Sequence, residues 1–169
     1  MGLLDIILGR QVQVALPTVL AIMPPEAVAE IQNGRLPQLN SNNIFLKNGE
    51  LCHYIDKAIL LKEKVQKSYV RKGGGYSMPG FFKGTRVHMN NGRTDMKENV
   101  ITEQFRGILY ITNKRTIFQA NKNAFDKPHT GLTALAPYSN AIELQYGEKT
   151  YSLLVPNGGI ISAVMDLLH

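Results

Sequence analysis

The most reactive side chains in this sequence belong to an adjacent cysteine and histidine, Cys52 and His53. A thiol and an imidazole can act as a nucleophile and its base, provided that the two side chains meet. Neighbouring residues of a β-strand point to opposite faces, and this pair lies in a strand-like stretch. We therefore expect a small buried cysteine beside an exposed histidine, and no catalytic residue here.

A metal site has no better support in the sequence. Cys52 is the only cysteine, whereas a structural zinc site takes several cysteine or histidine ligands. The histidines lack the spacing of metal ligands, and they are His53, His88, His129 and His169. We expect neither a bound metal nor a cofactor.

Another acid–base pair would arise if Asn91-Gly92 were a hairpin turn, because His88 would then lie opposite Asp95. We favour a surface ion pair as the interpretation of these two residues, and such pairs contribute little to stability. No nucleophile, base and orienting group come together elsewhere in the sequence. We therefore expect that the protein is not an enzyme.

The strongest candidate for binding is a basic stretch around Gly73-Gly74-Gly75, where backbone amides can approach an anion closely. The residues expected to bind an anion or a partner are Lys67, Arg71, Lys72, Lys83 and Arg86. Four aromatic residues interleave with these cations, namely Tyr69, Tyr76, Phe81 and Phe82. This pattern is typical of a membrane-contacting loop or of a platform for nucleic-acid bases. A solvated charged face that binds nothing is the alternative interpretation.

The elements that must position these residues are mainly β-strands. Pro24-Pro25-Glu26 predicts the start of a short helix, and Asn33-Gly34 predicts its end. Strand patterns follow from Ile44 onward. The alternating stretch over residues 51–70 is too long for one ordinary strand, so we expect a bend or a break near Leu60-Lys62.

Two later hairpins have turns that pair apolar residues across the strands. The turns are Asn113-Lys114 and Gly147-Glu148, and in the first we expect Asn113 to take a positive φ and Arg115 to contact Thr112. The predicted pairs are Leu109 with Phe118, Tyr110 with Ile117, Leu144 with Tyr151 and Ile142 with Leu153.

The chain closes with a predicted helix over residues 157–168, capped by Asn157 and carrying an apolar stripe. The whole order is a helix, about seven strands in meander order, and this last helix. It predicts a β-rich α+β fold, a bent antiparallel sheet or partly open barrel capped by the C-terminal helix. We divide the chain into an N-terminal helical arm, residues 1–43, and a β-rich domain, residues 44–169.

One segment, Gly107-Ile-Leu-Tyr-Ile-Thr-Asn-Lys-Arg-Thr-Ile-Phe118, resembles the G-x-L-Y-x-T-N-x-R-x-x-F motif of GRAM domains and related bacterial PH-like domains. Residues 46–54 and 134–142 resemble two further segments of that group, in the same order. The resemblance covers residues 44–155. It implies a PH-like fold, a strongly bent seven-stranded sheet closed by one helix, in a non-enzymatic module that binds phosphoinositides, other lipids or proteins. Asn113 and Arg115 of the motif are interpreted as structural turn residues.

The composition indicates the charge of the partner but does not identify its class. The chain has 44% hydrophobic and 19% charged residues, an ordinary globular composition, and its net charge of +6 favours anionic partners. No apolar stretch is long enough to span a bilayer. Met1–Leu8 lacks the basic start of a secretory signal and reads as a short amphipathic helix, so we expect a cytoplasmic protein with, at most, peripheral membrane contact.

Three functions remain open. The leading one is an adaptor that contacts an acidic protein surface or an anionic membrane through the basic glycine loop. The second is self-assembly through the apolar N-terminal residues Leu3, Leu4, Ile6, Ile7 and Leu8, in the manner of related bacterial domains that form rings. Nucleic-acid binding is the third, and it rests on charge and interleaved aromatic residues alone.

Overall fold

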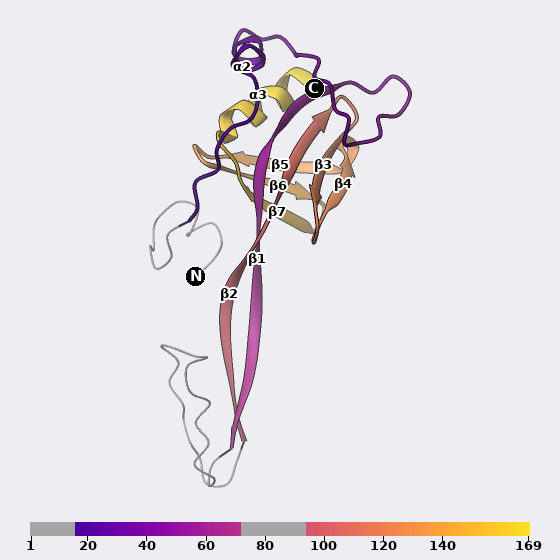
Figure 1. Ribbon diagram of the computed structural model, residues 1–169. Helices are drawn as coiled ribbons and strands as arrows, with labels where there is room; N and C mark the ends of the chain where they lie inside the picture. The colour runs from indigo at the N-terminus through magenta and orange to yellow at the C-terminus, as the bar shows by residue number, and fades with distance from the viewer. Residues whose placement is uncertain (1–15, 72–93) are drawn as a thin grey trace. The chain divides into compact units, whose positions relative to one another are not determined.

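The structure is a computed structural model that describes residues 16–71 and 94–169, with side chains for residues 16–67 and 100–169 (Figure 1). The chain divides into two compact units. The first comprises Met1–Leu61 and Gln104–His169, and the second comprises Lys62–Glu103. The helix expected over Met1–Leu8 lies outside the described residues.

Seven strands form one sheet, and every strand pair whose register is described is antiparallel. The strands are β1 (Cys52–Arg71), β2 (Thr94–Thr112), β3 (Arg115–Ala120), β4 (Phe125–Pro128), β5 (Leu132–Pro137), β6 (Ala141–Tyr146) and β7 (Lys149–Leu154). Their order in the sheet is β4-β3-β2-β1-β7-β6-β5, so the sheet is open, with β4 and β5 at its two edges. The predicted antiparallel sheet of seven strands with a C-terminal helix is confirmed.

The predicted meander order holds within β1–β4 and within β5–β7, and it is wrong between β4 and β5. The consecutive strands β4 and β5 lie at opposite edges, joined through the 3-10 turn η1 (His129–Gly131), and β7 returns to pair with β1. In that pair Ile59 lies opposite Leu154, and Leu60 lies opposite Leu153. Local turn signals specify hairpins between neighbouring strands, but they carry no information about a pairing between residues so far apart in the chain.

A break in β1 is also absent, since the strand runs without interruption from Cys52 to Arg71. Its neighbour β2 has 19 residues and no break, so the two long strands support each other's backbone hydrogen bonds. The division between the two units nevertheless falls after Leu61, close to the position where the break was expected.

The registers of the two later hairpins are confirmed. Leu109 lies opposite Phe118 and Tyr110 opposite Ile117 across the β2–β3 turn. Leu144 lies opposite Tyr151 and Ile142 opposite Leu153 across the β6–β7 turn, where Gly147 has a φ of +64°. Apolar cross-strand pairing therefore fixed both registers as the sequence predicted.

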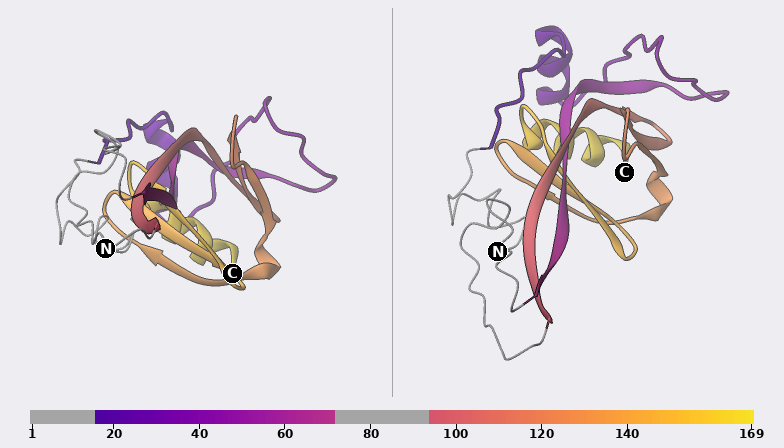
Figure 2. Two further views of the ribbon diagram at one scale, coloured as in Figure 1. Left: turned by 90° about the horizontal axis from the view of Figure 1, so that it is seen from below. Right: turned by 60° about the horizontal axis from the view of Figure 1, so that its bottom comes forward.

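Helix α3 (Gly158–Leu168) packs against β5 and β6 of the first unit, and helix α2 (Pro25–Gln32) packs against α3. Helix α2 begins and ends close to the predicted positions, and Gly34 takes the left-handed φ of +78° just beyond its end. Helix α3 is capped by Asn157, whose side-chain oxygen accepts a hydrogen bond from the Gly159 amide at 2.8 Å. Both helices contribute buried residues to the main core, and Figure 2 shows α3 on the concave side of the curved sheet.

The opposite face of the sheet is also apolar. Alternate residues of β1, β2, β3 and β7 face away from the main core and form two smaller clusters, one around Ile59 and Leu154 and one around Tyr110 and Ile117. Two segments from the N-terminal third cover these clusters. Leu16 and Val19 pack on the first cluster, and Ile44 and Leu46 pack on the second. We call residues 16–24 the strap and residues 43–51 the clamped loop.

Candidate partner-binding site

The clamped loop contains a tight turn immediately before β1. The amide of Glu50 donates to the carbonyl of Lys47 at 2.9 Å, and Gly49 takes a φ of +73°. A positive φ at the third residue of such a turn favours glycine, because a Cβ atom there is strained. The turn directs the Glu50 side chain into the protein, where the residue is only 5% exposed.

Glu50 is the anchor of the clamped loop. Its carboxylate accepts hydrogen bonds from Arg115 Nε at 2.8 Å, from Arg115 Nη2 at 3.2 Å, from Thr112 Oγ1 at 2.6 Å and from the Lys47 amide at 2.7 Å. Burial raises the pKa of Glu50, but these hydrogen bonds and the Arg115 charge outweigh it and lower the pKa to about 2. Glu50 is therefore a buried, charged and fully bonded structural group.

The turn residues of the β2–β3 hairpin hold the same loop. Asn113 accepts from the Leu51 amide at 2.9 Å and donates from Nδ2 to the Gly49 carbonyl at 3.1 Å. Lys114 Nζ donates to the Asn48 carbonyl at 2.7 Å. The backbone of the second half of the loop, residues 48–51, is therefore bonded to one hairpin turn.

The positive φ expected at Asn113 is wrong. Asn123, with a φ of 57°, is the sole non-glycine residue with positive φ within residues 16–71 and 94–169. The side chain of Asn113 is instead engaged by the clamped loop, a partner that no local pattern around the turn could reveal. Arg115 contacts Thr112, as expected, through its amide, which donates to the Thr112 hydroxyl at 3.0 Å.

Arg115 also holds the start of the clamped loop. Besides Glu50, its guanidinium donates to the Phe45 carbonyl and to the Asp126 carboxylate, both at 2.5 Å. Gln119 Nε2 donates to the Asn43 carbonyl at 3.2 Å. These contacts fix the backbone of residues 43–45 against β3.

The clamped backbone presents a large apolar side chain to solvent. Phe45 is 86% exposed, the highest value among the large hydrophobic residues within the described side chains. Beside it lies a hollow of about 380 Å³, lined mainly by apolar atoms of Ile44, Ile117, Ala124 and Phe125. The hollow and the aromatic side chain together form a surface that can receive an apolar group.

Two exposed cations lie here, Lys47 in the clamped loop and Lys114 in the hairpin turn that holds the loop. Asp126 is the acidic group at the hollow, and its carboxylate is paired with Arg115. The charge around Phe45 therefore favours an acidic partner.

The residues expected from the sequence to bind an anion are not assembled within the described part of the chain. Lys67 is exposed and belongs to the second unit, and Arg71 ends β1 with its side chain outside the described set. Lys72, Lys83, Arg86, the three glycines and the expected Asn91-Gly92 turn with His88 all fall outside the described residues. Their role stays a prediction.

Cys52 and His53 are both buried, so the expected exposed histidine is wrong. His53 is 5% exposed because residues 37–39 cover it, and its Nδ1 donates to the Pro37 carbonyl at 2.7 Å. Burial raises the pKa of Cys52 to about 11, so its thiol is a poor nucleophile at neutral pH. In the described ranges, no three histidine, cysteine, aspartate or glutamate side chains lie close enough to hold a metal ion.

Sequence reasoning missed Phe45 and Glu50. Glu50 lies within residues 46–54 and Arg115 within the hairpin motif, two segments of the same resemblance, but nothing in the sequence links these two residues, which are 65 positions apart.

Comparison with protein-family models, with curated proteins and with solved structures gave no match for this chain. None of the helices in the described ranges has the length and apolar character needed to cross a bilayer.

Proposed function

We propose that the protein is a non-enzymatic binding module that docks a protein partner through the clamped loop, with Phe45 as the anchor. One observation carries the proposal. Phe45 is 86% exposed, while hydrogen bonds from Arg115, Asn113 and Lys114 hold the backbone of its loop. An exposed aromatic group on a fixed backbone loses little conformational entropy on binding, which is the property of interface hot spots.

The surroundings of Phe45 favour an acidic protein surface as the partner. Lys47 and Lys114 supply positive charge on either side of the loop turn, and the chain as a whole carries a net charge of +6. The hollow beside Phe45 fits one apolar side chain of a partner, so that each protein would insert a group into the other. A membrane offers acyl chains but no such complementary side chain.

A PH-like identity of the fold is part of the same proposal. It is supported by the motif over residues 107–118, by the seven antiparallel strands and by the helix α3 that follows them. The fold alone says nothing about the ligand, so the functional argument depends on the clamped loop.

The experiment is a quantitative comparison of the proteins that co-purify with the tagged full-length chain and with two variants. Phe45→Ala removes the anchor. Lys47→Glu reverses the charge of an exposed side chain. Leu167→Ala is the matched control, because Leu167 is also an exposed apolar residue, 37% exposed, on α3. We expect an acidic protein that is lost from both loop variants and retained by the control.

The purified partner must then bind the wild-type chain directly. We expect Phe45→Ala to weaken that binding by at least about tenfold, since truncating a hot-spot residue costs about 2 kcal/mol or more. Equal affinity of wild type and Phe45→Ala overturns the proposal. Binding to vesicles with anionic lipid that is lost in Phe45→Ala, with no protein captured, would show instead that a membrane is the partner.

A further inference from the structure

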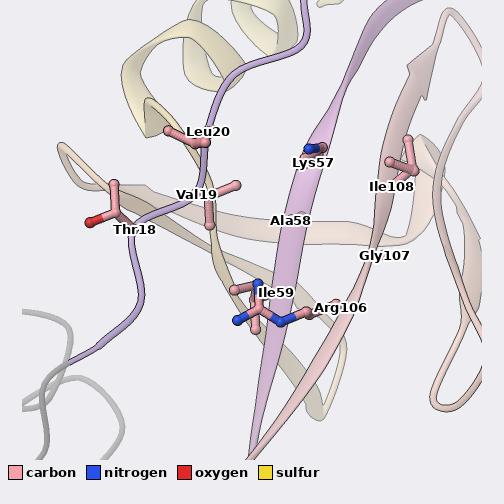
Figure 3. Close-up of a pocket in the computed structure, with 9 residues that line it drawn as sticks. All are labelled: Thr18, Val19, Leu20, Lys57, Ala58, Ile59, Arg106, Gly107 and Ile108. Carbon is pink, nitrogen blue, oxygen red and sulfur yellow. The ribbon is translucent and has the colours of Figure 1, made fainter.

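A second recess lies in the first unit between the strap and the outer face of the sheet. Thr18, Val19 and Leu20 of the strap form one wall, and residues 57–59 of β1 with 106–108 of β2 form the other (Figure 3). It encloses about 420 Å³. Pockets for small organic molecules have volumes of about 300–1,000 Å³, so this recess has the size of a small-molecule site.

The lining combines an apolar surface with two cations. The apolar lining residues include Val19, Ile59 and Ile108. Lys57 and Arg106 are the charged lining residues, both exposed, and no lining residue is acidic. In Figure 3 the Arg106 side chain extends from β2 in the direction of β1.

The strap is held in place independently of any ligand. The carboxylate of Asp56 accepts hydrogen bonds from the Ile22 amide at 2.7 Å and from the Lys57 amide at 2.9 Å. Leu16 and Val19 pack on the cluster around Ile59. Asp56 itself is 4% exposed and is not a lining residue, although its charge interacts with that of Lys57.

We propose that this recess binds a small organic anion: an apolar body of up to about ten carbon atoms that carries one carboxylate or phosphate group. Arg106 and Lys57 hold the anionic group, and Val19, Ile59 and Ile108 contact the apolar body. The volume of the recess matches a small organic molecule, and two cations among lining residues that include no acid select the charge of the ligand. This site is separate from the clamped loop and does not depend on the function proposed for it.

The test uses four probes of equal chain length: octanoate, octyl phosphate, octanol and octylamine. Binding to the full-length chain is measured by calorimetry, and the methyl signals of Val19, Ile59 and Ile108 are followed by NMR. We expect octanoate or octyl phosphate to bind and to shift these methyl signals. The relative affinity of the two anions identifies the head group. Octanol and octylamine should bind at least about tenfold more weakly, because each lacks the charge–charge contact.

Three variants locate the binding. Arg106→Gln and Lys57→Gln should each weaken the bound anion by about tenfold, and Leu20→Glu should place a carboxylate at the rim and abolish anion binding. All three side chains are exposed, so the fold should survive, and circular dichroism and melting curves check this. Lys149→Gln is the control, an exposed lysine on β7 that does not line the recess.

Three results would each overturn the proposal. One is the absence of binding by either anion up to millimolar concentration. The second is equal binding of octylamine and octanoate. The third is an anion affinity that Arg106→Gln and Leu20→Glu leave unchanged.

Discussion

The guanidinium of Arg115 and the carboxylate of Glu50 form a buried two-point contact, with Nε–Oε1 at 2.8 Å and Nη2–Oε2 at 3.2 Å. The side chain of Glu50 is fully shielded from solvent, and that of Arg115 is 12% exposed. Glu50 belongs to the loop before β1, and Arg115 begins β3. The contact therefore joins the N-terminal third of the chain to the hairpin motif that first suggested a PH-like fold.

Arg115→Lys should destabilise the protein by about 3 kcal/mol, measured as the free energy of unfolding in urea. A lysine cannot make the two-point contact, and breaking one side of a buried ion pair costs about 3–5 kcal/mol. Glu103→Gln is the control, because Glu103 pairs with Lys64 at the surface, where the side chains are 37% and 55% exposed. That control should lose less than about 1 kcal/mol. Equal losses in the two variants would show that the Arg115 contact is unimportant.

The same carboxylate predicts an acid dependence of stability. The pKa of Glu50 is lowered from 4.5 to about 2 in the folded protein, so folding is favoured by the ionised group. Its contribution is complete above pH 4.5 and is lost as the pH falls toward 2. The loss should reach about 3 kcal/mol, since each pKa unit corresponds to about 1.4 kcal/mol.

Unfolding free energies between pH 6 and pH 2 check this prediction. Wild type should lose stability more steeply than Glu50→Gln, which has no group to protonate at that position. Parallel curves for the two proteins would contradict the assignment of a lowered pKa to Glu50.

The contribution of Asp56 to stability should depend on pH in the opposite sense, because the pKa of Asp56 is raised in the folded protein whereas that of Glu50 is lowered. Burial raises the pKa of Asp56, although the amides of Ile22, Lys57 and Met23 partly offset the effect. The folded protein therefore favours the protonated acid, and this contribution is lost as the pH rises through the raised pKa. Asp56→Asn keeps an acceptor for the strap and should change stability at pH 7 by less than about 1 kcal/mol.

Asp56→Ala is the matched variant. It leaves the partly buried amide of Ile22 without its acceptor, so it should cost about 1 kcal/mol or more in thermal or urea unfolding. If Asp56→Asn is as damaging as Asp56→Ala, the hydrogen bond to the strap is not what Asp56 contributes.

Substitutions of Asn113 distinguish two explanations for the asparagine in the hairpin motif, a positive φ at the turn and hydrogen bonds made by the side chain. If its importance lay in a positive φ, Asn113→Gly would be neutral or stabilising. The side-chain bonds to Leu51 and Gly49 predict instead that Asn113→Gly and Asn113→Ala lose about the same stability, about 1–2 kcal/mol each. A clearly more stable Asn113→Gly in urea unfolding would favour the turn explanation.

Gly158, the first residue of α3, is packed against backbone. A Cβ atom there would lie 2.1 Å from the Ala141 carbonyl oxygen and 2.4 Å from that of Tyr138. Gly158→Ala should therefore cost about 3 kcal/mol or more, because neither backbone group can move aside cheaply. Gly159→Ala is the control, since its Cβ would meet only the Asn157 side chain, at 3.1 Å. Melting curves of the two variants should differ by several degrees at least.

The parts of the fold that sequence reasoning predicted are those with local causes. The Asn157 cap, the Gly34 helix end and the pairs Leu109–Phe118 and Leu144–Tyr151 all follow from residues a few positions apart. The parts that it missed depend on distant partners. No sequence pattern around Glu50 indicates that it binds Arg115. Likewise, no pattern around His53 indicates that Pro37 covers it. The candidate site was missed for the same reason, because the exposure of Phe45 matters only once its loop is known to be fixed.

The return of β7 to β1 has a consequence for how this protein is made. The two halves of the sheet meet through the pairs formed by Ile59, Leu60 and Leu61, and their partners in β7 are synthesised more than ninety residues later. Until then, a nascent chain carries β1 with one row of unpaired amides and carbonyls, which is a template for aggregation. Contacts between such distant residues also slow folding. Synthesis of β7 is thus the step that ends the exposure of β1 to aggregation.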